Sequence, residues 1–279
     1  MPSTETAIEW TETTWNPVHG CSKVSEGCAN CYAARISQRY EHTENEWAAE
    51  HAEENVQLQR HHLDWPYGLD EPSRVFVNSM SDLFHEQVPF GYVAKIFSVI
   101  EQCPEHVFIA LTKHGAETGR LQEWDQEVGH WPDNLWMGVS VENEARAYRM
   151  DELDATDAAV RWVSFEPLVG PVETYEPLQE MDWVVVGGES GPEDERREMH
   201  HAWARSIRRA ARVADVPFYF KQSSGPKQGH DPELAEDGAN PHEAEFLGAG
   251  TSVHRELPEL PEALREARPD LAEREVVPA

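Results

Sequence analysis

Three cysteines close together near the N-terminus are the residues of this sequence best suited to chemistry. They follow the pattern Cys21-x6-Cys28-x2-Cys31 within the run HGCSKVSEGCANCYA. Three thiolates can hold three irons of a [4Fe–4S] cluster and leave the fourth iron open, or they can bind zinc with a histidine or water as the fourth ligand. Thiols without a metal are the third interpretation. For zinc, His19 is the nearest candidate in the sequence.

The residues around these cysteines fit a metal-binding loop. Apolar residues at Tyr32, Ile36 and Tyr40 predict a helix over about 29–40, whose first N–H groups would favour an anionic cluster. Gly20 and Gly27 each precede a cysteine, as expected where backbone wraps closely around a metal. The fourth cysteine, Cys103, ends another predicted helix and is expected to be a core thiol.

The elements that must position the cysteines follow from the rest of the sequence. We predict strands over 13–17, 74–78, 106–111, 135–141, 160–165, 182–186 and 217–221, and helices over about 29–40, 45–62, 90–102, 115–126, 143–153 and 202–214. Apolar strands separated by helices indicate a parallel sheet buried on both faces. The predicted fold class is therefore α/β, with a partial or complete (β/α) barrel over residues 1–222. Residues 223–279, rich in Gly, Pro and acid, are predicted to form a largely irregular tail, with one short helix after Pro261.

Polar residues gather where the predicted strands end. Ligands of parallel α/β proteins sit at these carboxyl ends, although any strand must end in something polar. Taken together, these residues predict a pocket of mixed charge suited to a zwitterionic ligand. The candidates are Asp82, Lys113, Ser140, Glu142, Glu166, Gly187, Gly188, Glu189 and Lys221.

Several blocks of the sequence together resemble one family. They include IEWTETTWNPVHGCSKVSEGCANCYA, NSMSDLFHEQVP, LTKH, WMGVSVEN, RWVSFEPLVGPV, WVVVGGESGPEDERREMHHAW and PFYFKQ, and they span about residues 7–222. The chain resembles the phage and prophage family named after gene products thirty-seven and sixty-eight, a family with a three-cysteine motif often encoded beside a partner protein. That family is similar to divergent radical S-adenosyl-L-methionine (SAM) enzymes.

The resemblance implies a radical-SAM type of barrel, a [4Fe–4S] cluster on Cys21, Cys28 and Cys31, and SAM as cofactor. The usual radical SAM spacing has three and then two intervening residues, whereas this chain has six and then two. Gly187, Gly188 and Glu189 resemble the tripeptide that contacts the SAM amino group, but they follow the sixth strand instead of the second. Asp82 is the acid after the second predicted strand that could take this role.

The chain is strongly acidic, with 52 acidic against 23 basic residues and a formal net charge of −29. This charge argues against a free-standing basic nucleic-acid-binding domain and against binding to an anionic membrane surface. The content of 39% hydrophobic residues and 10 Trp argues against a disordered acidic protein. Scarce lysine and abundant acid are typical of a halophilic protein, because about 1 M salt reduces the Debye length to roughly 3 Å. We therefore expect loss of fold on dialysis into dilute buffer, followed by circular dichroism; full stability there would contradict this interpretation.

The sequence shows no membrane-spanning run and no basic, apolar leader at its N-terminus, which predicts a cytoplasmic protein. One region, Arg196–Arg212, nevertheless holds six arginines, namely Arg196, Arg197, Arg205, Arg208, Arg209 and Arg212. These residues could form salt bridges to the acidic remainder of the protein or contact phosphate or nucleic acid.

Two hypotheses of different classes follow. The first is a radical-SAM-like iron–sulfur enzyme of the phage family, with a substrate that the arginine-rich region would relate to nucleic acid. The second is a non-catalytic zinc- or cluster-binding protein that acts with a partner protein encoded by a neighbouring gene.

Overall fold

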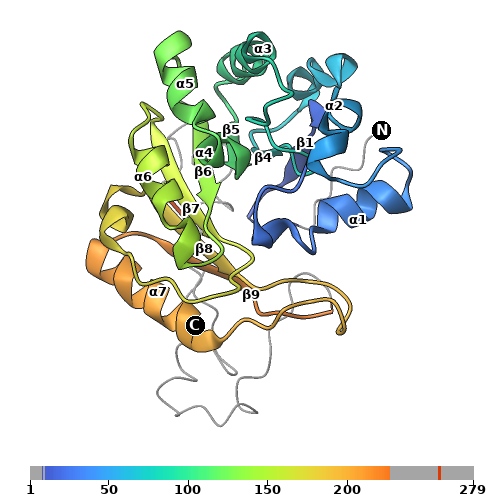
Figure 1. Cartoon of the computed structure of the whole chain (residues 1–279). Coiled ribbons are helices and arrows are strands. Elements are labelled where there is room, and N and C mark those ends of the chain that lie inside the picture. The colour runs from blue at the N-terminus through green and yellow to red at the C-terminus, as the bar shows by residue number, and fades with distance from the viewer. Residues whose placement is uncertain (1–7, 9, 227–256, 259–279) are drawn as a thin grey trace. The chain divides into compact units, whose positions relative to one another are not determined.

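Seven short, largely buried segments form parallel strands in the computed structural model (Figure 1), which describes residue 8, residues 10–226 and residues 257–258. The chain folds into two compact units. Unit 1 comprises the described residues of 1–140 and 148–161, and unit 2 comprises those of 141–147 and 162–279. The prediction of an α/β fold with parallel strands is therefore confirmed.

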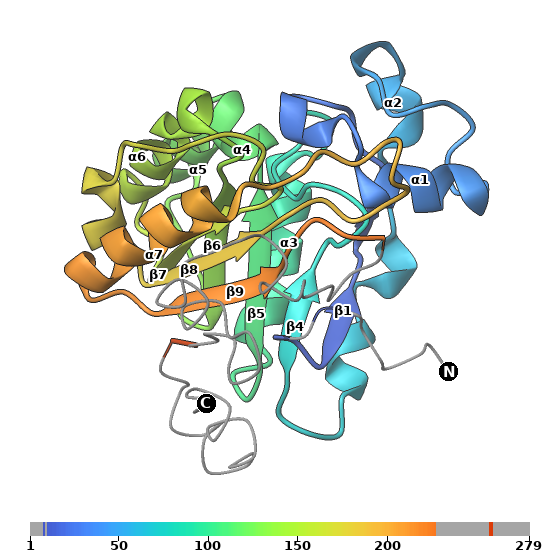
Figure 2. The same cartoon turned by 90° about the horizontal axis from the view of Figure 1, so that it is seen from below.

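Unit 1 contains the four strands β1 (Thr13–Trp15), β4 (Arg74–Val77), β5 (Val107–Thr112) and β6 (Leu135–Ser140), paired in that order. Every residue of β4 and β6 is buried, which explains why these strands lack polar alternation. Helices α3 (Phe90–Glu101), α4 (His114–Glu117) and α5 (Arg120–Glu127) connect β4 to β5 and β5 to β6. They lie on the same side of these strands (Figures 1 and 2), as expected for right-handed crossovers. Helix α6 (Tyr148–Asp154) and the 3-10 turn η5 (Glu144–Arg146) follow β6.

Aromatic side chains form much of the core of unit 1. Trp124 on α5 contacts Phe84, Phe90 and Phe97 edge to face, with ring centroids 4.9–6.1 Å apart. Such contacts stabilise a core by about 0.5–1.5 kcal/mol each beyond the apolar area that they bury.

Unit 2 contains most of β7 (Val160–Phe165) together with β8 (Trp183–Gly187) and β9 (Phe218–Gln222), again in chain order and parallel. A 3-10 helix, η6 (Glu176–Glu180), precedes β8, and helix α7 (His201–Ala214) precedes β9. Trp162 and Trp183 pack with ring centroids 5.1 Å apart. After β9, Gly225 forms an isolated parallel bridge with Ser190. Of the predicted tail, residues 223–226 and 257–258 are described; its other residues, including the helix predicted after Pro261, lie outside the described residues.

The N-terminal part of unit 1 differs from the prediction at one helix. The helix predicted over 45–62 is wrong: this stretch forms η2 (Ala49–His51), α2 (Ala52–Asn55), β3 (Gln57–Leu58) and η3 (Arg60–His62), before η4 (Trp65–Gly68). Strand β3 pairs antiparallel with β2 (Val18–His19). Buried Asn55 donates its side-chain amide to the Glu46 carbonyl oxygen at 2.8 Å, and extended Val56 ends the helix. Residues 45–62 lack the apolar stripe that would stabilise a helix by packing. These tertiary contacts therefore determine the local structure.

The described residues contain no helix that is both long enough and apolar enough to span a bilayer.

Buried His106, just before β5, makes the stability of unit 1 sensitive to acid. It is 1% exposed, its Nδ1 accepts the Ser73 N–H at 3.2 Å, and burial lowers its pKa. A histidine with a lowered pKa stays neutral in the folded protein but takes up a proton on unfolding below about pH 6.5, so stability is complete above that pH and lost below it.

We expect the midpoint of thermal unfolding to fall between pH 7.5 and pH 5.5 in high salt, and to fall less in the variant His106→Asn. Asparagine keeps an acceptor for the Ser73 N–H and does not titrate. An identical pH dependence in the two proteins would contradict a role for His106.

Candidate metal centre

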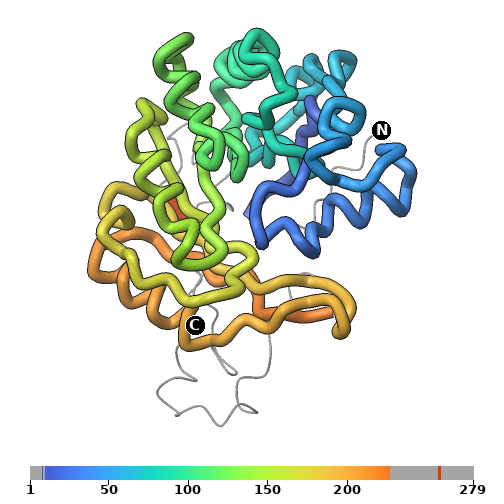
Figure 3. The backbone as a smooth tube through the Cα atoms, viewed as in Figure 1, coloured from blue at the N-terminus to red at the C-terminus, as the bar shows by residue number. Residues whose placement is uncertain are grey.

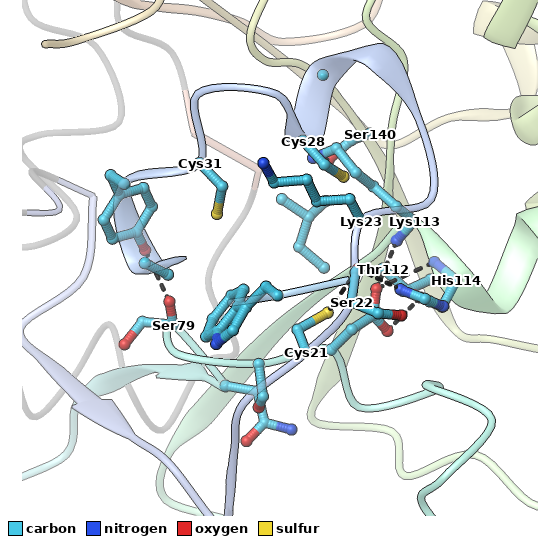
Figure 4. Close-up of a pocket in the computed structure, with 18 of the residues that line it drawn as sticks. Cys21, Ser22, Lys23, Cys28, Cys31, Ser79, Thr112, Lys113, His114 and Ser140 are labelled. Carbon is cyan, nitrogen blue, oxygen red and sulfur yellow. Dashed lines mark hydrogen bonds between the residues drawn. The ribbon is translucent and has the colours of Figure 1, made fainter. Parts of the chain in front are cut away.

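The three cysteines of the motif line one cavity in unit 1. Cys21 lies in the loop after β2, Cys28 ends the 3-10 turn η1 (Glu26–Cys28), and Cys31 is the N-cap of α1 (Tyr32–Arg39). Their sulfurs point into the same space (Figure 4), and the cavity has a volume of about 140 Å³. Its walls also include Tyr32, Trp47, Phe76, Asp82, Thr112, Lys113, His114 and Ser140. Cys21 and the pair Cys28 and Cys31 thus lie together beside the carboxyl ends of β4, β5 and β6. The sequence predicts a pocket at this end of the strands.

The loop that carries the cysteines is irregular (Figure 3), and hydrogen bonds anchor it at both ends. Gly20 has a φ of +81° and donates its N–H to the Met80 carbonyl oxygen at 3.0 Å. A Cβ at Gly20 would overlap the Asn55 carbonyl oxygen. At the other end, the Tyr32 hydroxyl donates to the Ser79 carbonyl oxygen at 2.9 Å. The requirement for glycine at position 20 therefore comes from close packing of backbone on backbone beside the cysteines.

The three motif cysteines are partly buried. Burial raises the pKa of the Cys21 thiol well above its usual range, and the charges of Asp82, Cys28 and Cys31 raise it further. Burial also raises the pKa of Cys31, against the lowering effects of the Ala34 and Ala33 N–H groups and of Lys113. The N–H groups at the start of α1 thus favour the thiolate form of Cys31. Both thiols are protonated at neutral pH without a metal, so binding of a metal must displace protons.

Asp82 is fully engaged by groups of its own chain. Its carboxylate accepts hydrogen bonds from the Thr112 hydroxyl at 2.6 Å and from the N–H groups of Lys113, His114 and Phe84 at 2.8–3.0 Å. Burial alone would raise its pKa, but His114 and these hydrogen bonds outweigh burial, and the pKa is lowered. Asp82 therefore caps the start of α4, a role that the sequence did not indicate.

Lys113 brings a cation to the cysteine cavity. Its ammonium Nζ donates to the Ser140 hydroxyl at 2.9 Å, and both residues line the cavity with the thiols. Lys23 lines it as well. Two of the few lysines in a chain of net charge −29 therefore face one cavity, which suits an anionic group.

Two buried histidines accompany Cys21. His85, in the loop after β4, and His114, the first residue of α4, have ring centroids 4.2 Å apart. Ligand atoms of Cys21, His85 and His114 all lie within 4.8 Å of one another. His19, the candidate for zinc from sequence, stacks on His42 at 5.8 Å and does not line the cavity. Sequence reasoning missed His85, which lies in the loop between β4 and α3, well beyond the end of the strand.

Six of the predicted pocket residues belong to unit 2: Glu142, Glu166, Gly187, Gly188, Glu189 and Lys221. Lys221 Nζ lies 3.0 Å from Glu166 Oε1, and the Ser164 hydroxyl donates to Glu166 Oε2 at 3.0 Å. Side chains at Gly187 and Gly188 would overlap the Glu166 carboxyl group and the Ser224 backbone, respectively. The side chain of Glu142 is buried, and its main-chain carbonyl oxygen accepts the Val169 N–H at 2.9 Å.

Glu189 is bound by a residue of the arginine-rich region. Its Oε2 accepts the Arg197 main-chain N–H at 2.7 Å, and its Oε1 accepts the Arg197 guanidinium through Nε at 3.1 Å and also through Nη2. Arg196 donates to the Gly191 carbonyl oxygen at 3.2 Å. These two arginines therefore hold the segment after β8, as the salt-bridge interpretation of the region predicts for Arg197.

Cys103 lies away from the cavity, in the turn after α3. It is 1% exposed, and burial raises its pKa to about 11. It does not line the cavity, which agrees with the prediction of a core thiol.

Searches among curated proteins and among solved structures returned no match. Residues 5–258 match the family described as "Protein of unknown function (DUF5131)". Because this match covers most of the 279 residues, the chain belongs to the DUF5131 family.

Proposed function

We propose that this protein is an iron–sulfur enzyme of the radical SAM type, built on a partial (β/α) barrel. The observation that carries the proposal is the convergence of Cys21, Cys28 and Cys31 on one cavity at the carboxyl ends of parallel strands. The sequence resemblance to the phage three-cysteine family supports the same activity.

The residues of the cavity fit a [4Fe–4S] cluster. Three thiolates are the ligand set that leaves one iron open, and such a cluster, when bound, supplies the electron for reductive cleavage of SAM. Trp47, Tyr32 and Phe76 line the cavity and would exclude water from it. The N–H groups at the start of α1 and the ammonium of Lys113 would compensate part of the negative charge.

Lys113 and Ser140 are the chain's candidates for holding a ligand carboxylate beside the thiols. The volume of about 140 Å³ is below the roughly 300–1,000 Å³ typical of pockets for drug-sized ligands. This cavity is therefore too small for a cluster together with a whole SAM molecule. Asp82 already accepts four hydrogen bonds. It would therefore attract the amino group of SAM through its negative charge more than through a new hydrogen bond.

Anaerobic reconstitution with iron and sulfide tests the proposal. The wild-type protein is expected to gain a broad absorption near about 400 nm from thiolate-bound iron, to give an EPR signal on reduction that changes with SAM, and to produce 5′-deoxyadenosine. The variant Cys28→Ala should lose all three properties, whereas the matched control Cys103→Ala should keep them.

Two results would count against the enzyme. Stoichiometric zinc with neither cluster nor 5′-deoxyadenosine would favour the non-catalytic alternative. Equal losses in Cys28→Ala and Cys103→Ala would refute the ligand assignment.

A further inference from the structure

We propose that Cys21, His85 and His114 form a second, mononuclear site for a zinc-class divalent cation. When this site is occupied, Cys21 binds the cation and is not a ligand of a cluster. The three residues come from three segments of unit 1, the loop after β2, the loop after β4 and the start of α4. Their ligand atoms lie within 4.8 Å of one another, and both histidines are at most 2% exposed. One thiolate and two imidazoles are a donor set that zinc favours, with a fourth position left for water or another ligand. The inference does not depend on the proposed function.

His114 is held as proteins hold a metal-binding histidine. Its Nε2 contacts the Ser22 carbonyl oxygen at 2.9 Å, and a carbonyl can only accept, so the neutral ring carries its hydrogen on Nε2. The lone pair is then on Nδ1, which is buried and has no hydrogen-bond partner among the described residues. An imidazole whose N–H is held by a main-chain carbonyl, and whose other nitrogen is bare, has the orientation and tautomer that a metal requires.

Glu86 places a negative charge beside this nitrogen. Its Oε2 lies 3.7 Å from His114 Nδ1. A carboxylate at this distance stabilises positive charge at Nδ1, whether a proton or a bound metal ion carries it. Glu86 is also the nearest carboxylate that could become a fourth ligand.

His85 can join the site at small cost. Its Nε2 lies 2.9 Å from the Ser22 hydroxyl, and its Nδ1 accepts the Gln87 N–H at 3.1 Å. Gln87 is exposed, so its N–H can be released to water while Nε2–H stays on the Ser22 hydroxyl. Ser22 would then accept the N–H of both imidazoles, through its hydroxyl and its carbonyl oxygen, which leaves Nδ1 of each ring as the nitrogen with a lone pair for a metal.

The shared Cys21 makes this site and a three-cysteine cluster mutually exclusive. A zinc ion on Cys21 removes one of the three thiolates that a cluster needs, whereas Cys28 and Cys31 take no part in the zinc site. Zinc would thus hold the protein in a state that cannot load iron and sulfide until the zinc is removed.

Titration of the metal-free, full-length protein with Co²⁺, followed by visible absorption and by competition with Zn²⁺, tests the site. We expect one equivalent to bind, with a thiolate-to-metal charge-transfer band. The variant His114→Gln keeps a side-chain N–H for the Ser22 carbonyl but lacks Nδ1. It should bind Co²⁺ at least about 100-fold more weakly, because loss of a residue that only supports a metal ligand already costs up to about 100-fold. Cys28→Ala with Cys31→Ala should bind like the wild type.

Two further measurements keep the outcome decisive. Glu86→Gln changes an exposed side chain that folding does not need, and should weaken Co²⁺ binding about tenfold. Prebound zinc should block reconstitution of the cluster in the wild type, whereas His114→Gln should reconstitute with or without zinc. Unchanged Co²⁺ affinity in both His114→Gln and Glu86→Gln would overturn the site, as would loss of binding in the Cys28/Cys31 variant. Failure of reconstitution in every protein would refute the proposed function and leave the cobalt result standing.

Discussion

Replacement of Gly20 by alanine is expected to lower the free energy of unfolding of unit 1 by roughly 2–5 kcal/mol and to abolish metal binding. A non-glycine residue at a φ of +81° costs about 1–2 kcal/mol, and the new Cβ must also push away the Asn55 carbonyl oxygen. Because Gly20 is hydrogen-bonded to Met80, this displacement would move Cys21 relative to the other two thiols.

Gly119 provides the matched control for this prediction. It has a φ of +73°, but a Cβ there would meet nothing within 4 Å. Gly119→Ala should therefore show only the conformational cost of about 1–2 kcal/mol and should bind metal like the wild type. Chemical denaturation in high salt and Co²⁺ titration of both variants measure the two effects. Equal behaviour of the two variants would show that the contact with Asn55 has no consequence.

The second large effect is expected at the buried ion pair between Glu117 and Arg149. The Arg149 side chain is 0% exposed, and its Nη2 and Nε lie 2.8 and 3.0 Å from Glu117 Oε2. Its Nη1 donates to the Ser140 carbonyl oxygen at 2.7 Å, at the end of the strand that brings Ser140 to the cavity. Glu117→Ala leaves this cation buried without its carboxylate, and we expect a loss of about 3–5 kcal/mol in the free energy of unfolding.

A double-mutant cycle distinguishes the pair from simple loss of packing. Arg149→Met combined with Glu117→Ala should cost less than the sum of the two single changes, because the double variant buries no unpaired charge. Tyr148→Phe removes an exposed hydroxyl that also donates to Glu117, and should cost below about 1 kcal/mol. Strict additivity in the cycle would contradict a coupled pair.

The strands and the longer helices could be predicted from sequence because local pattern and burial agree there. The runs VFV in β4 and LWMGV in β6 are apolar at every position, and the structure buries every residue of both strands. The thiol cluster was also recognisable, since its three members lie close together in the chain. The helix predicted over 45–62 failed because contacts of Asn55 and pairing of β3 with β2, both non-local, decide that segment.

The partners of the candidate residues could not be predicted, because they depend on side chains distant in sequence. His85 and His114 meet through the loops that follow β4 and β5. Glu189 was expected to face a ligand, yet both of its oxygens bind Arg197. Of the nine residues predicted for the pocket, only Asp82, Lys113 and Ser140 line the cysteine cavity. A sequence shows that a strand ends in a polar group, but not whether the chain itself already holds that group.

The four hydrogen bonds that Asp82 accepts carry a consequence for how this unit can evolve. One carboxylate joins the loop that bears His85 to the residues Lys113 and His114, which face the cavity. A substitution at Asp82 would displace the cation and both imidazoles in one step. Selection for a different metal and selection for a different ligand would therefore act on the same side chain, and neither property could drift without compensating changes in the other.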